Sequence, residues 1–337
     1  MRILIVAPAW IGDAVLSHTL LVRLKSRYPG STIDVLAPGW VLPVYRQMPE
    51  VADTITNPFA HGQIALGARW RLARELAGRA YQQAYVLPNS FKSALLPWMA
   101  GIAQRIGYVG EMRYGLLTDA RRLDQTVLPL MAERFAWLAQ ARGEALEKPL
   151  PRPRLQADAG ASATLLDRLQ LPRPAKLACF CPGAEYGPAK RWPEQYFAQL
   201  ARRLDAEGYS IWLLGSRKDA AVGDAIVQAS GGIARNLCGS TSLTDAVLLL
   251  SMADLVMTND SGLMHVAAAL DRPMVAIYGS SSPGFTPPLS DTARVVKLDL
   301  PCSPCFQRVC PLKHFNCMMQ LTPDQVHAQI RALNISS

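Results

Sequence analysis

Residues 177–214 read LACFCPGAEYGPAKRWPEQYFAQLARRLDAEGYSIWLL, and this stretch decides the fold. Its two ends, 177–181 and 210–214, are short apolar runs that predict buried strands. Between them, residues 193–207 predict a helix, because a proline opens the first turn, apolar side chains recur on one face and Gly208 follows. A strand, a helix and a second strand in this order form one unit of a parallel α/β sheet.

The same alternation continues on both sides of this unit. Short apolar runs predict strands at 3–7, 33–36, 84–87, 255–258, 274–278 and 294–298, and helices are predicted at 15–24 and 70–76. Alternation through both halves predicts an α/β protein with two doubly wound domains that face a cleft.

Proline-rich stretches at 148–155 and 171–176 predict a linker between the domains. We place the boundary between residues 165 and 166, which gives an N-terminal domain of residues 1–165 and a C-terminal domain of residues 166–337. The last helix is expected to stay with the C-terminal domain or to pack back on the N-terminal one.

The composition excludes a disordered or fibrous chain, since half of the 337 residues are hydrophobic. The net charge of +9 suits a polyanionic partner: a nucleic acid, an anionic membrane surface or a phosphorylated substrate. The chain contains no nucleic-acid-binding module, so a nucleic acid is not expected. No apolar run reaches the ~18 residues of a membrane span, and the first apolar run stops at Gly12, too early for a secretion signal. We expect a cytoplasmic protein with at most peripheral membrane contact.

The sequence PAWIGD at 8–13 follows the first predicted strand. It lacks the G-x-G-x-x-G pattern of dinucleotide-binding loops, which disfavours a nicotinamide cofactor. Asp13 has two interpretations: a cap of the next helix, or a carboxylate that accepts a proton from a substrate hydroxyl. The residues alone favour the cap.

The loop at 181–193 carries Lys190 and Arg191 close to the start of a helix, where the helix dipole favours an anion. A phosphate would satisfy both the cations and the free N–H groups. The alternative is an exposed basic loop.

The sequence TNDSGLMH at 258–265 predicts a strand, a polar turn and a helix capped by Asp260 or Ser261. Gly262 would allow a ligand to approach the backbone closely. His265 lies one turn beyond Ser261, so its imidazole can reach the helix start. Together these residues predict a second anion site suited to a diphosphate, whereas His265 alone could be a packing residue.

Two other patterns are less specific. The loop YGSSSPG at 278–284 could be any polar turn. Several cations of the first half are either scattered surface charges or ligand contacts, with Lys92 the best candidate for the cleft: Lys92, Arg105, Arg113, Arg121 and Arg122.

Seven cysteines, an odd number, disfavour a disulfide framework. Four of them have the spacing Cys302-x2-Cys305-x4-Cys310-x6-Cys317, with a histidine inside, which outlines a tetrahedral structural metal site. An iron–sulfur cluster, redox-labile thiols and packing cysteines are the alternatives. Four protein ligands would close such a site, so no catalytic metal is implied.

Four long stretches resemble the ADP-heptose:lipopolysaccharide heptosyltransferases of glycosyltransferase family 9. They are YVLPNSFKSALLPWMAG at 85–101, GEMRYGLLTDAR at 110–121, CPGAEYGPAKRWP at 181–193 and TNDSGLMHVAAAL at 258–270. The resemblance extends over nearly the whole chain. It implies the GT-B fold, in which two Rossmann-like domains face a cleft, with the acceptor on the N-terminal domain and the donor on the C-terminal one.

The resemblance implies an inverting glycosyltransferase. The enzyme would move heptose from ADP-heptose to heptosyl-Kdo2-lipid A at the inner face of the cytoplasmic membrane, as a monomer and without a cofactor or catalytic metal. The alternatives are transfer of the first or third heptose, a nucleotide-binding protein without activity, and a Rossmann oxidoreductase. The four-cysteine segment occurs in only some members of the family, so a metal there would be structural.

The resemblance also assigns roles to single residues. Asp13 would be the general base for the acceptor hydroxyl, and Lys190 would stabilise the leaving ADP. The donor would further contact Glu185, Tyr186, Asp219, Asp260, Ser261, Gly262 and His265, with Asp219 on the ribose and Asp260 on the heptose. The acceptor's phosphates and carboxylates would contact Lys92, Arg113 and Arg121.

Overall fold

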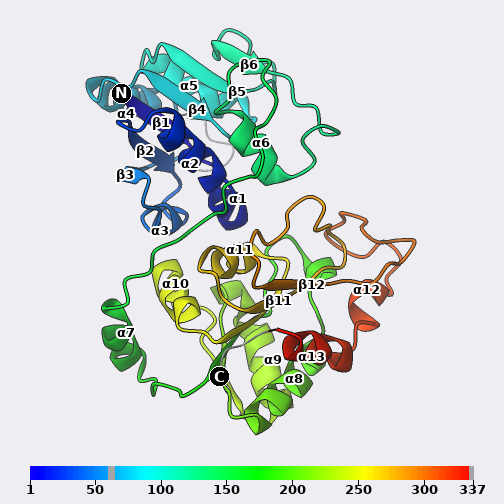
Figure 1. Ribbon diagram of the computed structural model, residues 1–337. Coiled ribbons are helices and arrows are strands. Elements are labelled where there is room, and N and C mark those ends of the chain that lie inside the picture. Colours follow the sequence, from blue (N-terminus) through cyan, green and yellow to red (C-terminus); the bar gives the residue numbers. More distant parts are fainter. Residues whose placement is uncertain (60–64, 334–337) are drawn as a thin grey trace. The chain divides into compact units, whose positions relative to one another are not determined.

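The computed structural model describes residues 1–59 and 65–333. The chain forms two compact units, Met1–Pro153 and Arg154–Ser337 (Figure 1). The division falls in the predicted linker region, whereas a boundary at 165/166 would cut through a short helix. That helix, α7 (Ala161–Leu169), belongs to the second unit, where the guanidinium of Arg168 lies 2.6 Å from the carboxylate of Asp245.

The first unit is built on a six-stranded parallel sheet with the order β3-β2-β1-β4-β5-β6. Its strands are β1 (Arg2–Val6), β2 (Thr32–Ala37), β3 (Val51–Thr56), β4 (Gln83–Val86), β5 (Gln104–Tyr108) and β6 (Asp119–Arg121). Its helices are α1 (Ile11–Leu16), α2 (His18–Arg27), α3 (Leu42–Tyr45), α4 (Leu66–Gly78), α5 (Phe91–Met99) and α6 (Met131–Trp137). Helices α4 and α5 bury their apolar sides against the central strands, while α1, α2 and α6 pack together on the other face (Figure 1).

The second unit repeats this plan with the order β12-β11-β10-β7-β8-β9, again parallel. Its strands are β7 (Leu177–Cys181), β8 (Ser210–Leu213), β9 (Ala234–Asn236), β10 (Leu255–Asn259), β11 (Met274–Ile277) and β12 (Ala293–Val296). Its further helices are α8 (Glu194–Ala206), α9 (Ala220–Ser230), α10 (Leu243–Ser251), α11 (Gly262–Ala269), α12 (Asn316–Met319) and α13 (Pro323–Arg331), with 3₁₀ turns η1 (Pro188–Lys190) and η2 (Arg217–Asp219).

The last helix, α13, packs against α8, β11 and β12 of its own unit. Val326 and Ile330 enter the core that α8, α9 and the central strands share. The apolar face of α13 is thus buried within the second unit.

The strands that were predicted are present, and the missed ones are β3, β5, β6 and β9. Three of these are edge or near-edge strands that are short or half-exposed, so they lack a continuous apolar run. The helix predicted at 15–24 is two helices, α1 and α2, which meet at Ser17. The hydroxyl of Ser17 donates to the carbonyl of Ala14 at 2.7 Å.

Both sheets have the strand order 3-2-1-4-5-6 of a doubly wound fold, so the predicted fold class is confirmed. The order reverses between β1 and β4 in the first unit and between β7 and β10 in the second. Ligands of such sheets bind beyond the carboxyl ends of the strands at this reversal. Asp13, in the first turn of α1, follows β1, and Asp260 follows β10. Lys92 and Lys190 follow β4 and β7.

Candidate active site

A buried ion pair lies at the strand reversal of the second unit. The ammonium Nζ of Lys190, at the end of η1, is 2.5 Å from Oδ2 of Asp260, and these side chains are 16% and 4% exposed. The hydroxyl of Ser281, after β11, donates to the same carboxylate oxygen. Because β7, β10 and β11 are neighbours, their loops meet at one point of the sheet edge. The predicted association of the 181–193 and 258–265 loops is thus present.

The start of α11 has no side-chain cap. Ser261 occupies the N-cap position with an extended backbone, but its side chain makes no capping bond. The predicted cap by Asp260 or Ser261 is therefore wrong, because the Asp260 carboxylate turns to Lys190 instead. The first N–H groups of α11, from Gly262 onward, have no capping side chain, and they carry the positive end of the helix dipole. A cation beside such a helix start makes it a candidate anion site.

His265 lies in the second turn of α11 and is 4% exposed. Its Nδ1 has no hydrogen-bond partner, and neither does the buried hydroxyl of Ser280, next to Ser281. Burial lowers the pKa of His265 to about 4; the charge of Asp260 opposes this shift and that of Lys190 adds to it. The imidazole is therefore neutral at pH 7. Buried polar atoms without partners are rare in proteins, and a bound ligand would supply them.

The buried His265 should make the protein less stable in acid. Its pKa is about 4 in the folded state and near 6.5 when unfolded. Below pH 6.5 the unfolded chain binds the proton first, so the free energy of unfolding falls as the pH drops to 4, by about 3 kcal/mol. Urea unfolding of wild type and His265→Gln at pH 7 and pH 4.5 measures this. The variant should lose less stability than wild type, whereas His327→Gln should behave as wild type.

Two cations lie close to the ring of Tyr186. Lys190 Nζ is 5.1 Å and the Arg308 guanidinium 5.2 Å from its centroid, and its hydroxyl donates to the Phe306 carbonyl at 2.7 Å. Arg308 is a candidate anion contact that the sequence did not reveal, because its segment follows the last strand. By contrast, Glu185 is exposed and pairs with exposed Lys218 at 2.5 Å.

Asp219 contacts the loop at 181–193 that carries Lys190 and Arg191. Its carboxylate accepts hydrogen bonds from the backbone and hydroxyl of Ser216, at 2.9 and 2.7 Å, and lies 3.7 Å from the Arg191 guanidinium. A Cβ at Gly183 would be 2.5 Å from Asp219 Cγ, so only glycine allows this contact. Arg191 thus has a carboxylate partner in η2. The ribose contact of Asp219 remains a prediction.

In the first unit, Asp13 is the third residue of α1 and half-buried. Its predicted capping role is wrong, because the N-cap position belongs to Trp10. The hydroxyl of Tyr45 shares a hydrogen bond with Ser17 at 2.9 Å. Burial raises the pKa of Tyr45, and the charge of Asp13 raises it further. A carboxylate thus follows β1, near enough to a buried phenol for its charge to raise the phenol's pKa. Its role as a base remains a prediction.

Lys92 is the second residue of α5 and half-buried. Arg113, in contrast, is 1% exposed. Its guanidinium donates to the carbonyl of Tyr108 at 2.5 and 2.9 Å and to that of Pro88 at 2.5 Å, and burial lowers its pKa to about 10. The structure therefore does not support a direct contact between Arg113 and the acceptor. The hydrogen bonds of Arg113 instead join the loop after β4 to the loop after β5.

Replacing Arg113 by leucine should lower the free energy of unfolding by about 3 kcal/mol, because buried carbonyls lose their donor. Chemical denaturation measures this, with exposed Arg122→Ala as the control, for which a change below about 0.5 kcal/mol is expected. Unchanged stability together with a raised KM for the acceptor would restore the predicted binding role.

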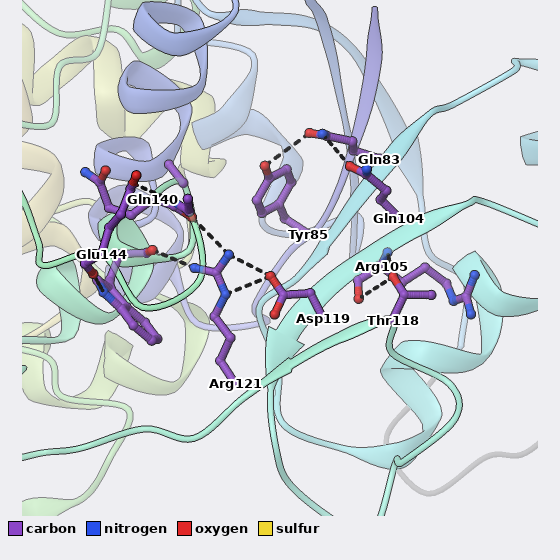
Figure 2. A network of polar contacts seen from close by, with 12 residues as sticks. Gln83, Tyr85, Gln104, Arg105, Thr118, Asp119, Arg121, Gln140 and Glu144 are labelled. Carbon is purple, nitrogen blue, oxygen red and sulfur yellow. Dashed lines mark hydrogen bonds and ion pairs between the residues drawn. The ribbon is translucent and has the colours of Figure 1, made fainter.

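The hydrogen-bond donors of Arg121 are also used by partners within the first unit. Figure 2 shows its guanidinium between Asp119 and main-chain carbonyls: it donates to Asp119 at 2.7 and 3.0 Å and to the carbonyls of Trp137 and Gln140 at 2.9 Å. It is 5% exposed. The predicted acceptor contact of Arg121 is not supported either, because these partners use its donors. Lys92 is left as the accessible member of the predicted acceptor group.

The thiols of Cys302, Cys305, Cys310 and Cys317 are free and half-buried. Within residues 1–59 and 65–333, no three histidine, cysteine or acidic side chains are arranged to hold a metal ion. The structural-metal hypothesis is therefore not supported by this geometry. The cysteine-containing segment instead packs against the loop after β11, next to the candidate anion site. Ser303 Oγ donates to the Gly279 carbonyl and Phe306 N to the Ser280 carbonyl.

Two doubly wound sheets, with a cation at an uncapped helix start beside a buried carboxylate, are typical of enzymes that bind nucleotide diphosphates. Comparison with known proteins makes the class specific. Residues 69–316 match the model of glycosyltransferase family 9 (heptosyltransferase). The chain belongs to this family and is a glycosyltransferase.

Among its relatives is lipopolysaccharide heptosyltransferase 2 of Salmonella typhimurium, 49% identical over 88% of each chain. That of Escherichia coli is 45% identical over 99% of this chain and 98% of its own. A solved structure of E. coli ADP-heptose lipopolysaccharide heptosyltransferase II has a TM-score of 0.88 at 43% identity and covers 98% of both chains. In the described part of the chain, no helix is both long enough and apolar enough to span a membrane.

Proposed function

We propose that the protein transfers L-glycero-D-manno-heptose from ADP-heptose to heptosyl-Kdo2-lipid A during assembly of the lipopolysaccharide inner core. The observation that carries this proposal is the Lys190–Asp260 pair at the uncapped start of α11. It supplies a cation and free N–H groups for a diphosphate, with a carboxylate for sugar hydroxyls. The identity to heptosyltransferases 2 over nearly the full chain supports the choice of sugar and acceptor.

In the proposed reaction, the acceptor hydroxyl oxygen attacks the anomeric carbon of the donor, and the bond from that carbon to the diphosphate breaks. Asp13 accepts the hydroxyl proton, which makes the oxygen nucleophilic as the new bond forms. Displacement from the opposite side inverts the anomeric configuration.

The ADP leaves with a developing negative charge on its terminal phosphate. Lys190 has three N–H donors, of which one is directed to Asp260, so the others can meet this charge together with the N–H groups of α11. Arg308, stacked on Tyr186, adds a second cation at the same loop. We propose that these groups neutralise the diphosphate, so that no metal cofactor is required.

The proposed acceptor is lipid-linked, so the enzyme would work at the inner surface of the cytoplasmic membrane as a peripheral protein. The experiment that tests the function is a transfer assay with ADP-heptose, using heptosyl-Kdo2-lipid A and Kdo2-lipid A in parallel, with and without a chelator.

Transfer to the heptosylated acceptor alone, unaffected by the chelator, is the expected result. Transfer to Kdo2-lipid A would move the assignment to the first heptose. Absence of transfer to both, with ADP still bound, would favour a nucleotide-binding protein without this activity. Loss of transfer with the chelator would contradict the metal-free proposal.

A further inference from the structure

Exposed apolar side chains gather at the carboxyl edge of the first sheet. They follow β1, β2, β4 and β5, and they are 42–83% exposed: Trp10, Trp40, Phe91, Met112 and Tyr114. Because these strands are parallel, their ends share one edge. This is the edge at which a doubly wound sheet binds its ligand.

Within this group, Trp10 and Trp40 are joined through the backbone. The indole Nε1 of Trp40 donates to the carbonyl of Ala9 at 3.1 Å, so the loop after β2 reaches the loop after β1. Trp10 is the next residue and the N-cap of α1. Since the N–H of Trp40 is occupied, its ring faces are what it can offer to a ligand.

Both indoles are exposed to solvent, although an indole is the largest apolar group that a protein can bury. Trp10 is 49% and Trp40 62% exposed, whereas buried aromatic residues contribute strongly to stability. Exposed apolar patches with polar residues around them mark interaction or ligand-binding sites. The hydrogen bond to Ala9 holds Trp40 in place, so ordering it on binding costs little.

Polar neighbours indicate what the ligand is. Asp13 lies in the first turn of the helix of which Trp10 is the N-cap, and Lys92 follows Phe91 at the same edge. A sugar ring has a C–H face that stacks on an aromatic ring and hydroxyls around its rim that need polar partners. An acyl chain would have no use for the polar neighbours.

We propose that Trp10 and Trp40 form a stacking platform for a sugar ring of the acceptor and place its hydroxyl beside Asp13. This inference rests on the proposed function and names the residues that position its second substrate. The platform acts on the acceptor saccharide alone, so both lipid-linked and deacylated acceptors depend on it.

The test compares Trp10→Ala, Trp40→Ala and Trp40→Phe with two controls, Trp70→Ala and Trp98→Ala. The control residues are 53% and 50% exposed, but they lie within α4 and near the end of α5 rather than in a loop or helix start directly after a strand. Thermal unfolding checks that each variant is folded. KM values are measured for ADP-heptose, for heptosyl-Kdo2-lipid A and for its deacylated saccharide.

Each alanine variant at the platform should raise KM for both acceptors roughly tenfold, the size expected for a lost aromatic stacking contact. KM for ADP-heptose should not change, the controls should match wild type, and Trp40→Phe, which keeps a ring face, should lose less than Trp40→Ala. An effect on the lipid-linked acceptor alone would overturn the proposal in favour of an acyl-chain or membrane contact. An equal effect in the controls, or none at the platform, would also overturn it.

Direct binding separates this proposal from the proposed function. The deacylated saccharide is titrated into wild type and Trp10→Ala in a calorimeter, without donor. Binding that weakens in Trp10→Ala supports the platform even if ADP-heptose proves to be the wrong donor. Equal binding by both proteins would contradict the platform while leaving heptose transfer untouched.

Discussion

Asp13→Asn should lower kcat for heptose transfer by roughly a thousandfold, the range in which general bases act. Asparagine has the shape of aspartate but cannot take the proton of the acceptor hydroxyl. Donor binding should not change, because the proposed donor site consists of residues of the second unit. The measurements are kcat with saturating substrates and calorimetric binding of ADP to the same preparations.

The position of Asp13 makes this substitution a clean test. It is not the cap of α1, so asparagine should leave the helix intact. Asp13→Glu keeps the carboxylate but displaces it by about one carbon–carbon bond, and positioning errors of this size cost roughly a hundredfold. Exposed Glu75→Gln on α4 serves as the control and should retain wild-type kcat. A fall of less than tenfold in Asp13→Asn would mean that another group takes the proton.

The sequence predicted the parts of the fold that are buried on both sides. Strands such as β1, β7 and β10 are continuous apolar runs because helices cover both faces of a parallel sheet. Strand β3 has exposed residues at two adjacent positions and at its last position, and β9 has only three residues, so neither has a periodic signal. Their strand character comes from pairing with a neighbour that the local sequence does not describe.

The candidate site was predictable where it depends on topology. Lys190 and Asp260 follow strands on either side of the sheet reversal, so a correct strand order brings their loops together. Arg308 was not predictable in this way. It reaches Tyr186 from a segment beyond the last strand, and its carbonyl accepts a hydrogen bond from Ala189. Nothing in the local sequence encodes that long-range contact.

The arginines show a different limit. Arg113 and Arg121 look, in sequence, like any cation available to an anionic acceptor. In the structure, main-chain carbonyls use their donors, and the cost of burying a guanidinium is offset by these hydrogen bonds. Gly110 and Gly115 flank Arg113 and indicate a tight turn around it. This turn was the sequence signal that could have revealed the structural role of Arg113.

Lys190→Ala should lower kcat by several hundredfold, because removal of one charged donor from a leaving-group site costs 10²–10³ in rate. It should also destabilise the protein by about 3 kcal/mol, since Asp260 remains buried with its charge uncompensated. A rate loss in this variant alone could therefore reflect altered structure rather than lost catalysis.

The double variant Lys190→Ala/Asp260→Asn separates the two causes. Neutralising residue 260 removes the unpaired charge, so urea unfolding should return toward the wild-type free energy. The rate should stay low, because no cation has been restored at the diphosphate. The exposed pair offers the control: Lys218→Ala breaks the contact with Glu185, and neither stability nor kcat should change beyond a small factor. Recovery of kcat together with stability in the double variant would mean that Lys190 only neutralises Asp260, and the leaving-group charge would then depend on α11 and Arg308.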